Sequence, residues 1–124
     1  MKSKTIIITA IAAVVATSFF VWWINWQRQP GKFDAFAQCL KEKNTMFYGT
    51  FWCSYCQKQK KMFGKSVKYL PYTECSTPDG RGQLPVCKEK ELEGYPTWEF
   101  NDGSRLSGLI SLTQLSEKTG CQLP

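Results

Sequence analysis

The chain has 124 residues, which is enough for one domain. Its formal net charge is +6, but Lys2, Lys4 and Arg28 supply three of these charges, and the rest of the chain carries thirteen basic and ten acidic residues. This balance gives no reason to propose nucleic acid as a partner. The chain also has six cysteines and no histidine. Such cysteine density is typical of an oxidising compartment and argues against a cytosolic protein.

The N-terminal segment is apolar. Residues 5–24, TIIITAIAAVVATSFFVWWI, contain no charged residue and no proline. Twenty residues in a helix can cross the ~30 Å hydrocarbon core of a bilayer. Trp22, Trp23 and Trp26 gather at the C-terminal end, where an interfacial aromatic belt is expected. We therefore expect residues 1–26 to form a single transmembrane anchor.

A cleaved signal peptide is the alternative for this segment, with a small-residue site near Ala16 or Ser18. Cleavage there would leave FFVWWINW as an apolar new terminus, so an uncleaved anchor is favoured. Two lysines and the free amine precede the span, whereas Arg28 and Lys32 follow it. This slight positive-inside bias places the N-terminus in the cytoplasm and the domain on the extracytoplasmic side.

Residues 27–32, QRQPGK, form a polar linker, and the globular domain is expected to occupy residues 33–124. Its first helix is predicted from apolar residues that recur at i, i+3, i+4 and i+7 within residues 33–44. Residues 46–52, MFYGTFW, form an almost continuous apolar run. Such a run suits a short strand that is buried on both faces.

A second helix is expected over residues 53–69. Cys56, Phe63, Val67 and Leu70 would share its buried face. The opposite face carries a lysine stripe, which is interpreted as a solvated surface. Its members are Lys58, Lys61, Lys65 and Lys68.

The second half of the domain contains clear turn signals. Pro71 ends the helix, residues 72–75 suit a strand, and a turn-rich loop leads to a short helix over residues 86–94. Two further strands flank Asn101-Asp102-Gly103, which predicts a hairpin. The last helix should begin at Ser111, with Gln114 completing a capping box, and stop at Gly120.

This order of elements predicts an α/β domain. The first two strands need a helical crossover and can pair in parallel, whereas the last two can pair antiparallel through their turn. A central mixed sheet with helices on both faces follows.

Cys53 and Cys56 form a Cys-x-x-Cys motif where the first strand meets the second helix. The unpaired N–H groups of a helix N-terminus favour a thiolate over a thiol, which suits reversible thiol–disulfide exchange. Two alternatives compete with this interpretation. One is an inert disulfide. The other is a zinc site with Cys75 and Cys87, whose spacing does not match a zinc knuckle.

The sequence resembles the thioredoxin-like superfamily in two motifs, FWCSYC at a helix start and GYPTW some forty residues later. The resemblance implies a cis peptide bond at Tyr95-Pro96, in a loop that faces the two cysteines. It is closer still to one branch, the thioredoxin-like domain that cyanobacteria and plants fuse to vitamin K epoxide reductase homologues. That branch is matched by FAQCL, FYGTFWCSYCQKQKKMFG and EGYPTWEFNDGSRLSG, within residues 33–120.

The resemblance implies a thiol–disulfide oxidoreductase, and with the expected N-terminal anchor the sequence predicts a membrane-anchored enzyme without a cofactor or metal. It would exchange disulfides with cysteine-containing secreted or membrane proteins, in electronic contact with a separate vitamin K epoxide reductase-like membrane protein. Cys53 would attack, Cys56 would resolve, and the loop of Tyr95 and Pro96 would hold the substrate, with Trp52 shaping the docking surface.

Two features depart from the pattern of thioredoxin. The position of its buried acid, six residues before the first active cysteine, is Phe47 here, which leaves water to accept the Cys56 proton. The residues between the cysteines are Ser54 and Tyr55 rather than the Pro-His of strong oxidases. An alternative function is therefore a non-catalytic binding module, in which Cys53 and Cys56 form a structural disulfide.

The other four cysteines allow structural bridges. Cys75 ends a strand and Cys87 opens a helix, so a bridge between them would pin the intervening loop, and this bridge also fits the family pattern. Cys39 and Cys121 are the remaining pair. Six cysteines allow fifteen connectivities, and a buried free thiol is the alternative for Cys39.

Overall fold

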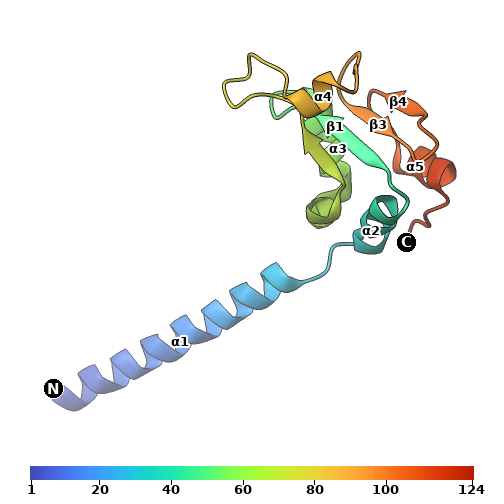
Figure 1. Ribbon diagram of the computed structural model, residues 1–124. Helices are drawn as coiled ribbons and strands as arrows, with labels where there is room; N and C mark the ends of the chain where they lie inside the picture. Colours follow the sequence, from blue (N-terminus) through green and yellow to red (C-terminus); the bar gives the residue numbers. More distant parts are fainter. The chain divides into compact units, whose positions relative to one another are not determined.

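The computed structural model describes residues 1–124 as two compact units, Met1–Pro30 and Gly31–Pro124 (Figure 1). The first unit is a single helix, α1 (Lys2–Arg28), in which no residue is buried. It is long and apolar enough to cross a membrane, a property that a signal sequence near an N-terminus would share. The helix includes the first two residues of the expected linker.

The second unit is built on a four-stranded mixed sheet, in the order β2-β1-β3-β4. The central strand β1 (Met46–Gly49) pairs in parallel with β2 (Tyr72–Glu74) and antiparallel with β3 (Thr97–Glu99). The last strand, β4 (Arg105–Ser107), completes the predicted hairpin with β3. This is the thioredoxin-like arrangement that the sequence predicts.

Helices cover both faces of this sheet. Successive residues of a strand point to opposite faces, and Phe47 and Tyr48 of β1 enter two different cores. The main core, around Phe47 and Trp98, receives side chains from α2 (Asp34–Glu42), α3 (Ser54–Phe63) and α5 (Leu112–Thr119). The smaller core, around Tyr48, receives Cys87 from the one-turn helix α4 (Pro85–Lys88).

Two expected elements end earlier than predicted. The first strand stops at Gly49, because the backbone turns at Thr50, whose C=O accepts the N–H of Cys53 at 3.2 Å. The apolar residues that follow β1 are therefore exposed rather than buried, as Trp52 at 57% shows. The helix expected over residues 86–94 is only the single turn α4.

The long second helix is also interrupted. It ends at Phe63, Gly64 adopts a φ of +54°, and the chain continues as the 3-10 helix η1 (Gly64–Tyr69). The α-helical spacing is lost at this glycine, so the prediction for Val67 was wrong: it is 39% exposed. Cys56, Phe63 and Leu70 are buried as predicted, and the lysine stripe is exposed.

The C-terminal helix follows its sequence signals. Ser111 and Gln114 form the predicted capping box at the start of α5, and Gly120 ends it in the left-handed region with a φ of +75°. Just beyond this helix, Cys121 is bonded to Cys39 of α2.

Candidate active site

Three strand ends meet at the start of α3. In the sheet register Gly49 lies opposite Glu74 of β2, and Tyr48 lies opposite Thr97 of β3. Pro96 directly precedes Thr97, so the sheet places it beside the end of β1. The chain then turns from β1 into Cys53. The Cys-x-x-Cys motif and Pro96 therefore lie at the same edge of the sheet.

The first cysteine caps the helix that carries the second. Cys53 is the N-cap of α3, and its Sγ accepts the backbone N–H of Cys56 at 3.2 Å. An N–H group aimed at a sulfur stabilises its negative charge, as expected for a helix N-terminus. Both residues are free thiols in the structure. Cys53 retains 8% of its surface, whereas Cys56 has none, so only Cys53 is within reach of a partner's sulfur.

The protein interior holds Cys56 as a thiol. Burial, followed by the hydrogen bond with Cys53, raises the pKa of Cys56 to about 12, although the backbone of Thr50 and the charge of Lys60 oppose this rise. A thiol with such a pKa is a weak nucleophile at neutral pH. The two cysteines thus differ in access, and the buried one is held as a thiol, which suits an attacking and a resolving role.

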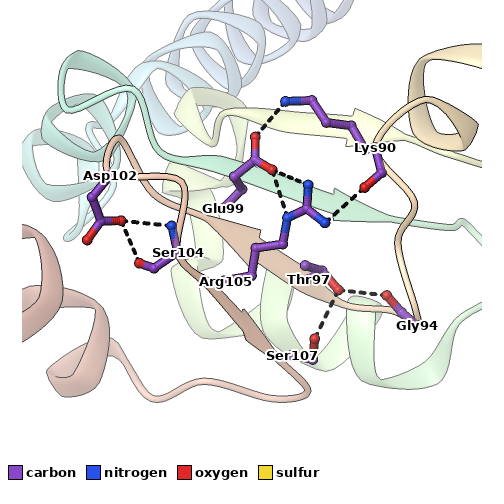
Figure 2. A network of polar contacts seen from close by, with 8 residues as sticks. All are labelled: Lys90, Gly94, Thr97, Glu99, Asp102, Ser104, Arg105 and Ser107. Atoms are coloured by element: carbon purple, nitrogen blue, oxygen red, sulfur yellow. Dashed lines mark hydrogen bonds and ion pairs between the residues drawn. The ribbon is translucent and has the colours of Figure 1, made fainter.

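The Tyr95–Pro96 peptide bond is cis, as the resemblance implies. The loop is fixed on both sides of this bond. The Thr97 hydroxyl donates to the C=O of Gly94 at 2.7 Å (Figure 2). The C=O of Pro96 accepts the N–H of Gly108 at 2.9 Å. No backbone hydrogen bond within the chain engages Tyr95.

A charged cluster lies farther along the same hairpin (Figure 2). The carboxylate of Glu99 contacts Lys90 Nζ at 2.7 Å and Arg105 Nη2 at 2.7 Å. The guanidinium of Arg105 also donates to the C=O of Lys90 at 2.9 Å. These contacts connect the segment before the cis proline to both strands of the hairpin.

The loop of residues 76–86 connects the other two predicted substrate residues. Trp52 is half exposed, and its indole N–H donates to the Ser76 hydroxyl at 3.0 Å. The amide of Gln83 donates to the hydroxyl of Tyr95. The Cys75–Cys87 disulfide closes the base of this loop. Trp52 and Tyr95 therefore both contact one loop that is covalently closed.

The structure thus brings together Cys53, Cys56, Trp52, Tyr95 and Pro96. It pairs the other cysteines as Cys39–Cys121 and Cys75–Cys87. The four-thiolate zinc alternative would need the thiolates of Cys75 and Cys87, which are bonded to each other.

Sequence reasoning missed one residue that fixes the active-site helix. Gln59 is completely buried, and its amide accepts the N–H of Ile110 and donates to the C=O of Ile110, each at 2.9 Å. It therefore holds α3 to the segment that precedes α5. Its spacing of three from Cys56, on the face predicted to be apolar, is the signal that could have identified it.

Sequence reasoning also missed the surroundings of the Cys56 sulfur. Lys60 of α3, Tyr72 and Glu74 of β2, and Gly49 of β1 all lie around this thiol or contact its neighbours. They come from three elements, and no spacing in the sequence relates the residues of one element to those of another.

Comparison with known proteins identifies a homologue of this chain. No family model matches the chain. Over 94 residues, however, the chain is 45% identical to "Thiol-disulfide oxidoreductase LTO1" of Arabidopsis thaliana. The chain is homologous to a thiol–disulfide oxidoreductase. The matched stretch is 72% of this chain and 24% of the plant protein, so the chain spans about a quarter of its relative's length.

Proposed function

We propose that this chain is a thiol–disulfide oxidoreductase that exchanges disulfides with cysteine-containing secreted or membrane proteins. The single observation that carries the proposal is the asymmetry of its cysteine pair. Cys53 retains some exposed surface and accepts a helix N-terminal N–H group, whereas Cys56 is completely buried. The homology to LTO1 supports the same chemistry.

In the proposed reaction the Cys53 thiolate attacks one sulfur of a substrate disulfide. The substrate's other sulfur leaves as a thiolate and takes up a proton. Cys56 then loses its proton and attacks Cys53 Sγ, which releases the second substrate thiolate. Two electrons pass to the substrate, and the Cys53–Cys56 disulfide remains. The reverse sequence oxidises a substrate dithiol, and the relative reduction potentials set the direction.

The loop of the cis proline would hold the substrate during these steps. The unengaged N–H and C=O of Tyr95 can pair with an extended substrate segment, as an added strand does at a sheet edge. Pro96 is fully buried and fixes the position of this edge. The exposed ring of Trp52, which directly precedes Cys53, would supply apolar contact area.

We further propose that α1 anchors the domain on the extracytoplasmic side of a membrane, where electrons pass between Cys53–Cys56 and a vitamin K epoxide reductase-like membrane protein. The length and composition of α1 support the anchor. Six cysteines in one small domain, four of them in disulfides, support an oxidising compartment. The reductase partner rests on the resemblance of the sequence motifs.

The decisive experiment for the activity is a redox titration of the full chain in detergent. The Cys53–Cys56 pair should equilibrate with a glutathione buffer within minutes and yield a reduction potential. A binding module with a structural disulfide would instead ignore the buffer until the protein unfolds. The control is the Cys53→Ser chain, which should show no such equilibrium.

The side of the membrane on which the domain lies needs a separate test. A reporter that is active only outside the cytoplasm should work when fused after Pro124, and a cytoplasmic reporter at the same position should be silent. Activity of the cytoplasmic reporter alone would reverse the proposed orientation.

A further inference from the structure

The resolving step requires a charge in the protein interior. Cys56 must become a thiolate before it can attack Cys53, although it has no exposed surface. The buried acid that could take its proton in thioredoxin is replaced by Phe47, whose ring stacks on Trp98 at 4.7 Å between centroids. Some other group must therefore offset the cost of this negative charge.

Lys60 is the cation placed to do so. It follows Cys56 by four residues on α3, so the two side chains lie on the same face of the helix. Helical side chains incline toward the N-terminus, which directs the lysine back toward Cys56. Burial raises the pKa of Cys56, and the ammonium of Lys60 opposes this effect together with the larger contribution of the Thr50 backbone, of which only the ammonium is a charge.

The ring of Tyr72 holds this ammonium in place. Lys60 Nζ lies 3.4 Å from the centroid of the ring, within the range of a strong cation–π contact. The same ring, on β2, packs against the buried cluster that contains Cys56. A Cβ on Gly49 would be 3.0 Å from Cys56 Sγ and 3.1 Å from Tyr72 Cε2. The sulfur and this ring carbon are therefore at most about 6 Å apart.

Tyr72 is itself fixed. Its hydroxyl donates to Glu74 Oε2 at 2.6 Å, and Glu74 Oε1 accepts the N–H groups of Phe51 and Ser76 at 3.2 and 3.0 Å. Burial, followed by the hydrogen bond to this carboxylate, raises the pKa of Tyr72, so the phenol stays neutral. A neutral ring with a fixed face attracts a cation without neutralising its charge.

We propose that Lys60, held against the ring of Tyr72, stabilises the Cys56 thiolate that resolves the mixed disulfide, with Tyr72 as its positioning residue. This inference rests on the proposed function. In the step concerned, the Cys56 S–H bond breaks and its proton passes to solvent. The Cys56 sulfur then bonds to Cys53 Sγ as the bond to the substrate sulfur breaks, and the electron pair leaves with the substrate thiolate.

Other titratable groups also face this thiol. Cys53, the N-cap of α3, raises the pKa of Cys56. Glu74 of β2 accepts a hydrogen bond from Tyr72, whose ring lies between this carboxylate and the thiol. The loop before β3 contributes Tyr95, which packs against the same core cluster. Lys60 is the positive group among them, so removal of its charge should raise the pKa of Cys56.

The test uses the full chain in detergent with glutathione bound to Cys53 as a mixed disulfide. The rate of glutathione release is measured between pH 6 and 9. Lys60→Gln should slow release at neutral pH by roughly tenfold, the effect of a nearby charge in a partly buried site. Lys60→Arg should restore the rate. The matched control is Lys61→Gln, which removes an exposed charge and should leave the rate unchanged.

Two further variants test the ring. Tyr72→Phe keeps the ring face and should retain most of the rate, whereas Tyr72→Leu removes the face and should resemble Lys60→Gln. The inference is overturned if Lys60→Gln releases glutathione as fast as the unsubstituted chain, if Lys61→Gln is equally slow, or if Lys60→Arg fails to restore the rate.

A second readout does not depend on exchange. In the Cys53→Ser chain, the Cβ resonance of Cys56 reports its ionisation by NMR, and Lys60→Gln should move that titration to higher pH. If the titration moves but the unsubstituted chain exchanges no disulfide, the proposed function fails and the inference stands. If exchange occurs but the titration is the same with and without Lys60, the inference fails and the function stands.

Discussion

The sulfur of Cys56 lies directly against Gly49. A Cβ on Gly49 would be 3.0 Å from that sulfur and 3.3 Å from the Cβ of Cys56, closer than most real Cβ contacts. Both partners are fixed, since Gly49 belongs to the central strand and Cys56 is fully buried in the first turns of α3. The last residue of β1 thus has to lack a side chain for Cys56 to occupy its position.

Gly49→Ala should therefore destabilise the domain and slow disulfide exchange. We expect a loss of about 1–3 kcal/mol in the free energy of unfolding, typical of an overpacked core. Denaturant unfolding and the redox titration would measure the two effects. Gly94→Ala is the stability control, because a Cβ there meets nothing within 4 Å. Equal stability of the two variants would contradict the role given to Gly49.

The difference in access between the cysteines predicts what each substitution traps. Cys56→Ser should accumulate substrate proteins as stable mixed disulfides on Cys53, because nothing remains to release them. Cys53→Ser should trap almost none, since Cys56 has no exposed surface. Non-reducing gels followed by mass spectrometry would compare the two. Abundant mixed disulfides on the Cys53→Ser chain would reverse the assigned roles.

The two structural disulfides should contribute unequally to stability. Cys39 and Cys121 are separated by 82 residues, and Cys75 and Cys87 by 12. In the chain-entropy model their removal costs about 4.5 and about 3 kcal/mol, because the longer bridge restricts the unfolded chain more. Paired Cys→Ser variants of each bridge, unfolded in denaturant, would test this order. The opposite order would show that the shorter bridge acts mainly on the folded state.

Glu99 should make the stability depend on pH. Burial raises the pKa of Glu99, but hydrogen bonds from Lys90 and Arg105 outweigh it and lower the pKa overall. The stabilisation is therefore present above the unfolded value of ~4.3 and is lost as pH falls through the lower folded value. Since the Glu99 side chain is only 15% exposed, Glu99→Gln should cost roughly 1–2 kcal/mol at pH 7.

This difference between Glu99→Gln and the unsubstituted chain should shrink in acid, which thermal unfolding at pH 7 and pH 3 would show. Glu117→Gln is the matched control, because it changes an exposed carboxylate of α5. A constant difference across pH would mean that the substitution acts through packing rather than through charge.

The sequence predicted those features that depend on local signals. The capping box of Ser111 and Gln114, the turn at Asn101-Asp102-Gly103 and the helix start at Cys53 each follow from a few adjacent residues. The cis bond at Pro96 followed from the resemblance. Periodicity failed where backbone geometry overrides it, as at Gly64, whose positive φ ends α3 and exposes Val67.

The surroundings of Cys56 could not be predicted for a different reason. Tyr72 approaches the thiol only because β2 pairs with β1 in the register that places Tyr72 opposite Phe47. A shift of one residue would turn this ring to the other face of the sheet. The register depends on packing of the whole core, so the contact between Lys60 and Tyr72 has no signature in the sequence.

The unengaged N–H and C=O groups of Tyr95 have a consequence for the stage of folding at which a substrate can react. A segment can add to this edge only if its own N–H and C=O groups are unpaired. Around a cysteine in a folded helix or a central strand, these N–H and C=O groups are already hydrogen-bonded within the substrate. The proposed enzyme would then act on chains that are newly exported or misfolded, and its reaction with a given cysteine would cease once the surrounding segment folds.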